Sequence, residues 1–202
     1  MTPAEIGDEG DSEPRYSYRP AAFGSPRSFR LLPNELEWEV GARKGRVSYR
    51  RISRVRLSYR PATMQNHRFL TEIWSSETNR PLKILSSSWK SMVEQVRLDR
   101  EYARFIVELH RRIAATGSAA AFDGGINPLL FGLGLLVFVA AVIGMAALSV
   151  RAIAAGAGMA AFLIGAFLLI FLWQAGNIFY RNRPGSYRPD ALPPLLMPSV
   201  KD

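Results

Sequence analysis

The sequence contains no cysteine, and its only histidines are His67 and His110. Disulfide bonds, cysteine-ligated metal sites and thiol nucleophiles are therefore excluded. The sequence also has no GxSxG motif, no glycine-rich phosphate loop and no histidine-rich metal set. These absences predict a protein that is not an enzyme and that holds no metal ion or cofactor.

Charge is nearly absent from residues 127–180, where Arg151 is the only charged residue. Arg151 separates two uncharged segments of 22 residues each, Leu129–Val150 and Ala152–Trp173. An α-helix rises about 1.5 Å per residue, so about 20 residues cross a hydrocarbon core about 30 Å thick. Residues 127–180 are therefore predicted to form a two-span transmembrane hairpin, with a very short loop centred on Arg151.

The charges that flank this hairpin predict its orientation. Arg151 is alone on the far side, whereas the near side carries five arginines, at Arg111, Arg112, Arg181, Arg183 and Arg188. The positive-inside rule then places both termini in the cytoplasm. Neither span contains an acid or a histidine, so no proton relay is expected within the bilayer.

Small residues recur along both predicted spans, many of them four positions apart, and such rows let helix backbones approach closely. They are Ala140, Gly144, Ala154, Ala157, Gly158, Ala161 and Gly165. Packing of the hairpin on itself is the favoured explanation. Oligomerisation, or docking on another membrane protein, is the alternative.

Three segments outside the hairpin have little apolar content or many helix breakers. Residues 1–27 are predicted to be a disordered arm, and residues 117–126 a linker of small residues. Residues 181–202 contain five prolines and are predicted to be a non-helical cytoplasmic tail. This tail is expected to lie extended at the interface, to fold back on its own domain, or to bind a groove of a partner.

Residues 28–116 are predicted to form one small cytoplasmic α+β domain. Alternating apolar and polar residues predict short, largely antiparallel strands at Phe29–Leu32, Glu35–Val40, Arg46–Tyr49, Val55–Pro61, His67–Ser75 and Pro81–Ser86. The capping-box pattern Ser91-Met-Val-Glu94 then predicts the start of an amphipathic helix that runs to Ile113. His110 lies next to the apolar stripe of this helix and is expected to be a packing or surface residue.

The strands followed by one helix resemble the pleckstrin-homology-like (PH-like) domains of bacterial membrane proteins. The similarity covers about residues 28–115 and is carried by Leu31–Trp38 (LLPNELEW), Val47–Val55 (VSYRRISRV), the hairpin Phe69–Leu85 and the helix. The resemblance implies a small antiparallel barrel or sheet closed by the helix, anchored in the bacterial inner membrane. Here the hairpin follows the domain, whereas in relatives it often precedes it.

Acidic residues are absent between Val40 and Thr71, and this stretch holds nine cations. They are Arg43, Lys44, Arg46, Arg50, Arg51, Arg54, Arg56, Arg60 and Arg68. Arginine binds phosphate and carboxylate as a planar fork, so we expect these residues to contact anionic lipid headgroups or an acidic protein partner. Pairing with Glu35, Glu37, Glu39 and the acids of the predicted helix is the simpler alternative, and nucleic acid is a weaker candidate.

The net charge of the 202-residue chain is +9, and the part before Ile126 holds 21 of the 26 basic and 15 of the 17 acidic residues. That part therefore carries +6, which suits an anionic surface. The sequence predicts a membrane-anchored binding module. The alternative is an accessory or assembly subunit of a larger membrane complex, or a homo-oligomer, that docks through the small-residue faces of the hairpin.

Overall fold

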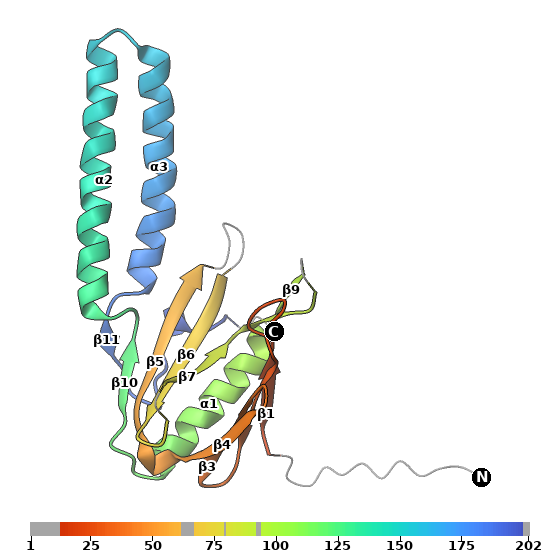
Figure 1. Ribbon diagram of the computed structural model, residues 1–202. Coiled ribbons are helices and arrows are strands. Elements are labelled where there is room, and N and C mark those ends of the chain that lie inside the picture. The colour runs from red at the N-terminus through yellow and green to blue at the C-terminus, as the bar shows by residue number, and fades with distance from the viewer. Residues whose placement is uncertain (1–12, 62–66, 79, 92–93, 200–202) are drawn as a thin grey trace.

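The computed structural model describes residues 13–61, 67–78, 80–91 and 94–199. A domain of sheets and one helix carries a long hairpin of two helices, which projects from one end of it (Figure 1). The fold is mixed α+β, with largely antiparallel sheets, as the sequence predicts.

The first sheet is antiparallel, and its strands lie in chain order. They are β1 (Arg15–Tyr18), β2 (Arg27–Leu31), β3 (Glu35–Val40) and β4 (Arg43–Ser48). Successive side chains of a strand point to opposite faces. Phe29 and Leu36 therefore enter the core, whereas Glu37 on the outer face pairs with Arg46 at 3.1 Å.

The second sheet begins after a short 3₁₀ helix, η1 (Tyr49–Arg51), which starts at the last residue of the predicted strand Arg46–Tyr49. Its strand order is β11-β10-β5-β6-β7. The strands are β5 (Ile52–Pro61), β6 (His67–Ser75), β7 (Leu82–Leu85), β10 (Ala121–Gly124) and β11 (Gly185–Ser186). Strand β10 is parallel to β5, and the other pairs are antiparallel.

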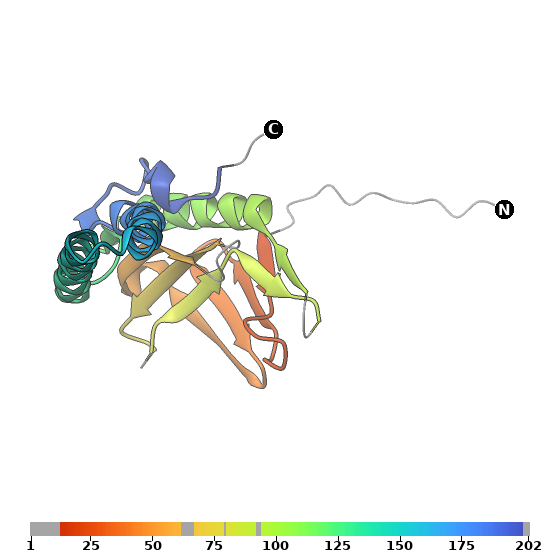
Figure 2. The same cartoon turned by 90° about the horizontal axis from the view of Figure 1, so that it is seen from above.

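Helix α1 (Asp99–Ala115) lies across the sheets (Figure 2) and supplies part of their core. Its fully buried side chains include Tyr102, Ile106, Leu109 and Ile113. The Tyr102 hydroxyl lies 2.6 Å from the Thr71 hydroxyl on β6. The described strands form separate sheets, so the part of the chain that the structure describes contains no closed barrel.

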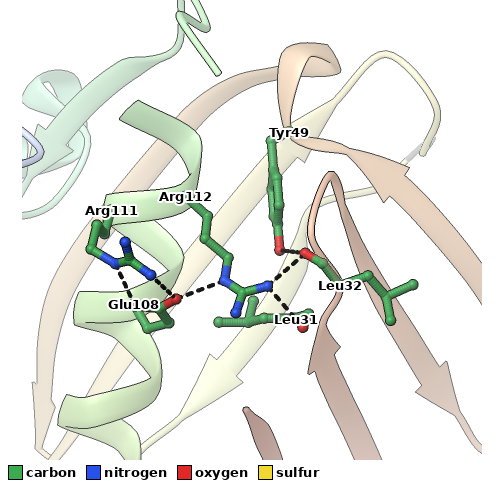
Figure 3. Close-up of polar contacts among 6 residues, drawn as sticks. All are labelled: Leu31, Leu32, Tyr49, Glu108, Arg111 and Arg112. Carbon is green, nitrogen blue, oxygen red and sulfur yellow. Dashed lines mark hydrogen bonds and ion pairs between the residues drawn. The ribbon is translucent and has the colours of Figure 1, made fainter. Parts of the chain in front are cut away.

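An arginine near the end of α1 ties the helix to the first sheet (Figure 3). Arg112 donates from Nη1 to the carbonyl oxygens of Leu31 and Leu32, at 3.1 and 2.8 Å, and from Nε to Glu108 at 2.7 Å. The Tyr49 hydroxyl donates to the same Leu32 carbonyl. Hydrogen bonds from Arg111 and Arg112 outweigh desolvation and lower the pKa of Glu108 to about 2.

The predicted disordered arm is wrong for residues 13–27, and residues 1–12 lie outside the described part. Strand β1 pairs with β2 along its whole length, and Tyr16 and Tyr18 are each only 3% exposed. The acidic start of the chain lowers the average hydropathy of residues 1–27. That average hides two alternating aromatic side chains, which form an edge strand once they pack against Phe29 and Phe105.

The predicted start of α1 is also wrong. The helix begins at Asp99, and the preceding residues form a hairpin of β8 (Ser87–Trp89) and β9 (Gln95–Arg97). Ser91 does accept a hydrogen bond from the Glu94 amide at 3.1 Å, as in a capping box. The same contact also occurs in tight turns, so the motif does not by itself specify a helix.

The hairpin consists of α2 (Pro128–Ala154) and α3 (Gly158–Arg181), each long and apolar enough to cross a membrane. The turn is centred on Gly156, which has a φ of +73°, rather than on Arg151. Arg151 instead lies in the last turn of α2, where a cation complements the helix dipole. The Asn127 side chain caps α2 by accepting from the Leu129 amide at 2.9 Å.

Aromatic side chains rather than the predicted small residues form much of the contact between α2 and α3. Phe138 packs on Phe171 and Phe179, with ring centroids 5.3 and 5.2 Å apart. Of the seven small residues, Ala161 is buried and Gly165 is half-buried, whereas the other five are exposed. Packing of the hairpin on itself therefore does not explain most of the small-residue rows.

Candidate functional site

Four of the nine predicted cations have carboxylate partners that come from other strands or turns. Arg46 pairs with Glu37 of β3, and Arg51 pairs with Glu77 after β6. Asp123 of β10 lies 3.1 Å from Arg54 and 3.8 Å from Arg56. Of the pairs that the simpler alternative expects, only Arg46 with Glu37 occurs. Arg51, Arg54 and Arg56 are paired as well, but with Glu77 and Asp123, which that alternative did not include.

The other five cations lie on four elements, with two pairs of neighbours, Arg43 with Lys44 and Arg60 with Arg68, and do not make one basic face. Arg43 and Lys44 lie on β4, Arg50 in η1, Arg60 on β5 and Arg68 on β6. None of the five has a carboxylate within 4.0 Å among residues 13–61, 67–78, 80–91 and 94–199. Arg60 and Arg68 are direct cross-strand partners, so two like charges face one another at one end of the second sheet.

The foot of the hairpin is joined to that same end of the sheet by Asn182, which is fully buried. The Asn182 Oδ1 atom accepts from the Tyr59 amide at 2.9 Å, and its Nδ2 donates to the Ile178 carbonyl at 3.1 Å. Its backbone carbonyl accepts from the Ile126 amide at 3.2 Å. One residue therefore connects β5, the entry to α2 and the end of α3.

Gly125 completes this junction on the α2 side. Its amide donates to the Leu57 carbonyl at 2.8 Å, and its φ is +82°. A Cβ at this position would overlap the carbonyl oxygens of Asn182 and Arg183. The predicted linker, residues 117–126, is thus wrong for 121–124, because that segment is strand β10 and runs directly into a packed junction.

The proline-rich tail folds back on the sheet domain, the second of its three predicted arrangements. Leu196 in η2 (Pro194–Leu196) is 4% exposed and belongs to the core. A Cβ at Gly124 would lie 2.9 Å from Leu196 Cδ1. The Tyr187 hydroxyl lies 2.8 Å from His110 Nε2. The tail therefore packs against both β10 and α1.

His110 is fully buried, with Nδ1 2.7 Å from the Ile106 carbonyl. Burial lowers its pKa to about 4, so the imidazole is neutral at pH 7. With Nδ1–H donating to Ile106, Nε2 accepts from the Tyr187 hydroxyl. The predicted packing role of His110 is confirmed. The described residues contain no group of three His, Cys, Asp or Glu side chains placed to hold a metal ion.

A cavity of about 230 Å³ lies where the tail meets the end of α3. Its lining includes Gly124, Tyr180, Arg181, Arg183, Leu195 and Leu196. The Arg181 guanidinium lies 4.8 Å from the Tyr59 ring centroid, and that of Arg183 lies 5.7 Å from the Tyr180 ring centroid. From the sequence, these two arginines were predicted only to flank the second span. The cavity was missed because its other wall consists of apolar side chains further along the tail, between prolines.

A larger trough of about 720 Å³ crosses the outer face of the first sheet. Arg15, Arg30, Lys44 and Arg46 line it together with Glu37 and Glu39. Both signs of charge alternate there and pair with one another, as Glu37 does with Arg46. This trough therefore has no clear preference for an anion.

Comparison with known proteins identifies no relative, since no protein-family model, curated protein or solved structure matches the chain.

Proposed function

We propose that this protein is a non-enzymatic, membrane-anchored module of the PH-like type, held at the cytoplasmic face of a bacterial inner membrane. The observation that carries this proposal is the exposure of the hairpin. Side chains such as Leu133, Ile143, Leu163 and Phe167 are each at least 60% exposed to solvent on α2 and α3. Helices of 27 and 24 residues measure about 40 and 36 Å, which matches a bilayer.

The order of the elements supports the PH-like part of the proposal. From β1 to α1 the chain forms the four antiparallel strands of the first sheet, the antiparallel strands β5 to β7, the hairpin of β8 and β9, and one covering helix. In this chain the second sheet is extended by β10 and β11, which bracket the hairpin in sequence. The hairpin therefore enters and leaves through the sheet itself, which supports an anchor that holds the domain close to the membrane.

Cysteine-scanning topology analysis tests the anchoring, and the absence of native cysteine makes it direct. Ala155→Cys places a thiol in the exposed turn of the hairpin, and Glu101→Cys places one on the exposed side of α1. In intact cells a membrane-impermeant maleimide should label the first variant and not the second. Labelling of both variants from the same side contradicts a two-span anchor.

The mechanism we propose is positioning: the anchor holds unpaired cations against anionic headgroups or an acidic partner. Arg60 is the best placed of these on the sheet, because its neighbour Tyr59 contacts the foot of α3 through Asn182. Arg50 is another exposed cation, just before the other end of β5. The ten residues of β5 separate the two by about 30 Å.

Hydrogen exchange of the full chain in nanodiscs tests this contact. Phosphatidylglycerol should protect the amides at the Arg60 end of β5 more than phosphatidylcholine does. Arg60→Glu should remove the difference, whereas the matched control Arg50→Glu should keep it. Equal protection in anionic and neutral nanodiscs contradicts lipid contact and leaves an acidic protein as the partner.

A second candidate function is an accessory subunit of a larger membrane complex. It is favoured by the exposed small residues that the hairpin does not use, since a Cβ at Gly144 or Gly158 would meet no atom within 4 Å. Purification of the full chain in a mild detergent should then recover a partner in fixed stoichiometry. Recovery of a lone monomer contradicts this alternative.

A further inference from the structure

The cavity between the tail and the end of α3 combines two kinds of lining. Leu195, Leu196 and Tyr180 give it an apolar wall, and Arg181 and Arg183 place two cations at it. Leu195 and Tyr180 are 41% and 57% exposed, so the apolar wall is open to a ligand rather than closed into the core.

The two arginines of this cavity are held by aromatic rings and not by acids. Arg181 lies over Tyr59 and Arg183 over Tyr180, and neither has a carboxylate within 4.0 Å in the described part of the chain. Asp123, on the neighbouring strand β10, is already shared by Arg54 and Arg56. A cation–π contact leaves the positive charge in place, so both guanidinium groups remain able to bind an oxyanion.

The position of the cavity along α3 selects the kind of anion. Arg181 is the last residue of the helix, and the exposed aromatic residues Trp173 and Tyr180 precede it. Trp and Tyr in such positions lie at the level of lipid headgroups when a helix crosses a bilayer. The apolar wall is continuous with the exposed side of this helix through Tyr180.

We propose that this cavity binds one anionic phospholipid, with the phosphate on Arg181 and Arg183 and the glycerol and upper acyl chain against Leu195 and Tyr180. This inference depends on the membrane anchoring proposed above. It adds, beside the headgroup contact proposed for Arg60, a specific lipid site at the junction of anchor and tail. The folded-back tail forms one wall of this site.

Native mass spectrometry of the full chain in a non-ionic detergent tests the site, with phosphatidylglycerol and phosphatidylcholine as probes. The wild type should retain phosphatidylglycerol in preference. Arg183→Gln should weaken that binding about fivefold, the effect of about one interfacial cation. The matched control Arg188→Gln removes an exposed arginine of the same tail that does not line the cavity, and it should behave like the wild type.

A second variant separates the two parts of the site. Leu195→Ala should weaken retention of both lipids and leave their ratio unchanged, because it trims the apolar wall only. Equal effects of Arg183→Gln and Arg188→Gln, or displacement of phosphatidylglycerol by inorganic phosphate, would overturn the phospholipid site. The anchoring has its own readout: a chain that is extracted from membranes by alkaline carbonate refutes the proposed function itself.

Discussion

The junction at Asn182 gives the sharpest prediction about how the anchor is coupled to the sheet domain. Asn182→Ala removes the acceptor of the buried Tyr59 amide and the donor to the Ile178 carbonyl. A buried donor left without a partner costs about 1–3 kcal/mol. The variant should therefore lower the free energy needed to open this junction by about that amount.

Hydrogen exchange measures this loss at the atoms concerned. In the full chain, in detergent or nanodiscs, the Tyr59 and Ile126 amides should exchange about 5- to 150-fold faster in Asn182→Ala than in the wild type. Asn177→Ala is the matched control, because Asn177 is an exposed asparagine of α3, the helix that Asn182 caps. If both variants exchange at the same rate, Asn182 does not hold the hairpin to β5.

Two further predictions concern buried groups around this junction. The pKa of His110 lies at about 4 in the folded state and about 6.5 in the unfolded state, so the unfolded chain binds more protons between these values. The free energy of unfolding should therefore hold its full value above pH 6.5 and fall by about 3 kcal/mol as the pH drops to 4. If the free energy of unfolding of a His110→Gln variant falls equally between these pH values, His110 is not the cause. Gly125→Ala should destabilise the chain by at least about 1 kcal/mol because of its φ of +82° and the overlap with backbone carbonyls, whereas Gly132→Ala, with no atom within 4 Å, should leave the thermal midpoint nearly unchanged.

Local sequence patterns were sufficient to predict those helices and strands whose structure depends mainly on their own residues. The absence of charge from residues 127–180 predicts two long apolar helices, and the structure has them. The alternation in Glu35–Val40 and His67–Ser75 predicts strands with those bounds. The prediction that the loop is centred on Arg151 was wrong, because a single cation is also stable in the last turn of a helix, where its charge complements the helix dipole.

Distant partners were needed for the elements that the sequence did not predict. Strand β1 exists because Tyr16 and Tyr18 pack under α1 and against Phe29. Strand β10 exists because its four residues pair with β5, more than 60 residues earlier. Neither segment is long or apolar enough to be recognised alone, since short strands depend on neighbours for their stability.

The arginine-rich stretch shows the same limit for the candidate site. The stretch itself contains no acidic residue. Glu37, Glu77 and Asp123, which lie on other strands or turns, nevertheless form ion pairs with four of its cations. Arg181 and Arg183, which have no carboxylate within 4.0 Å among the described residues, lie elsewhere. They are beside apolar tail residues that a proline-rich composition does not assign to any site.

By itself the sequence determined the class of architecture: a basic α+β domain followed by two helices of membrane-spanning length. These features follow from composition and short-range periodicity, which act within each segment. Only the tertiary structure decided which cations keep their charge unpaired, how Asn182 fastens the hairpin to the sheet, and that the tail closes a cavity at the end of α3. Those features depend on side chains that meet across long sequence separations, where packing and burial, rather than local preference, select the partner.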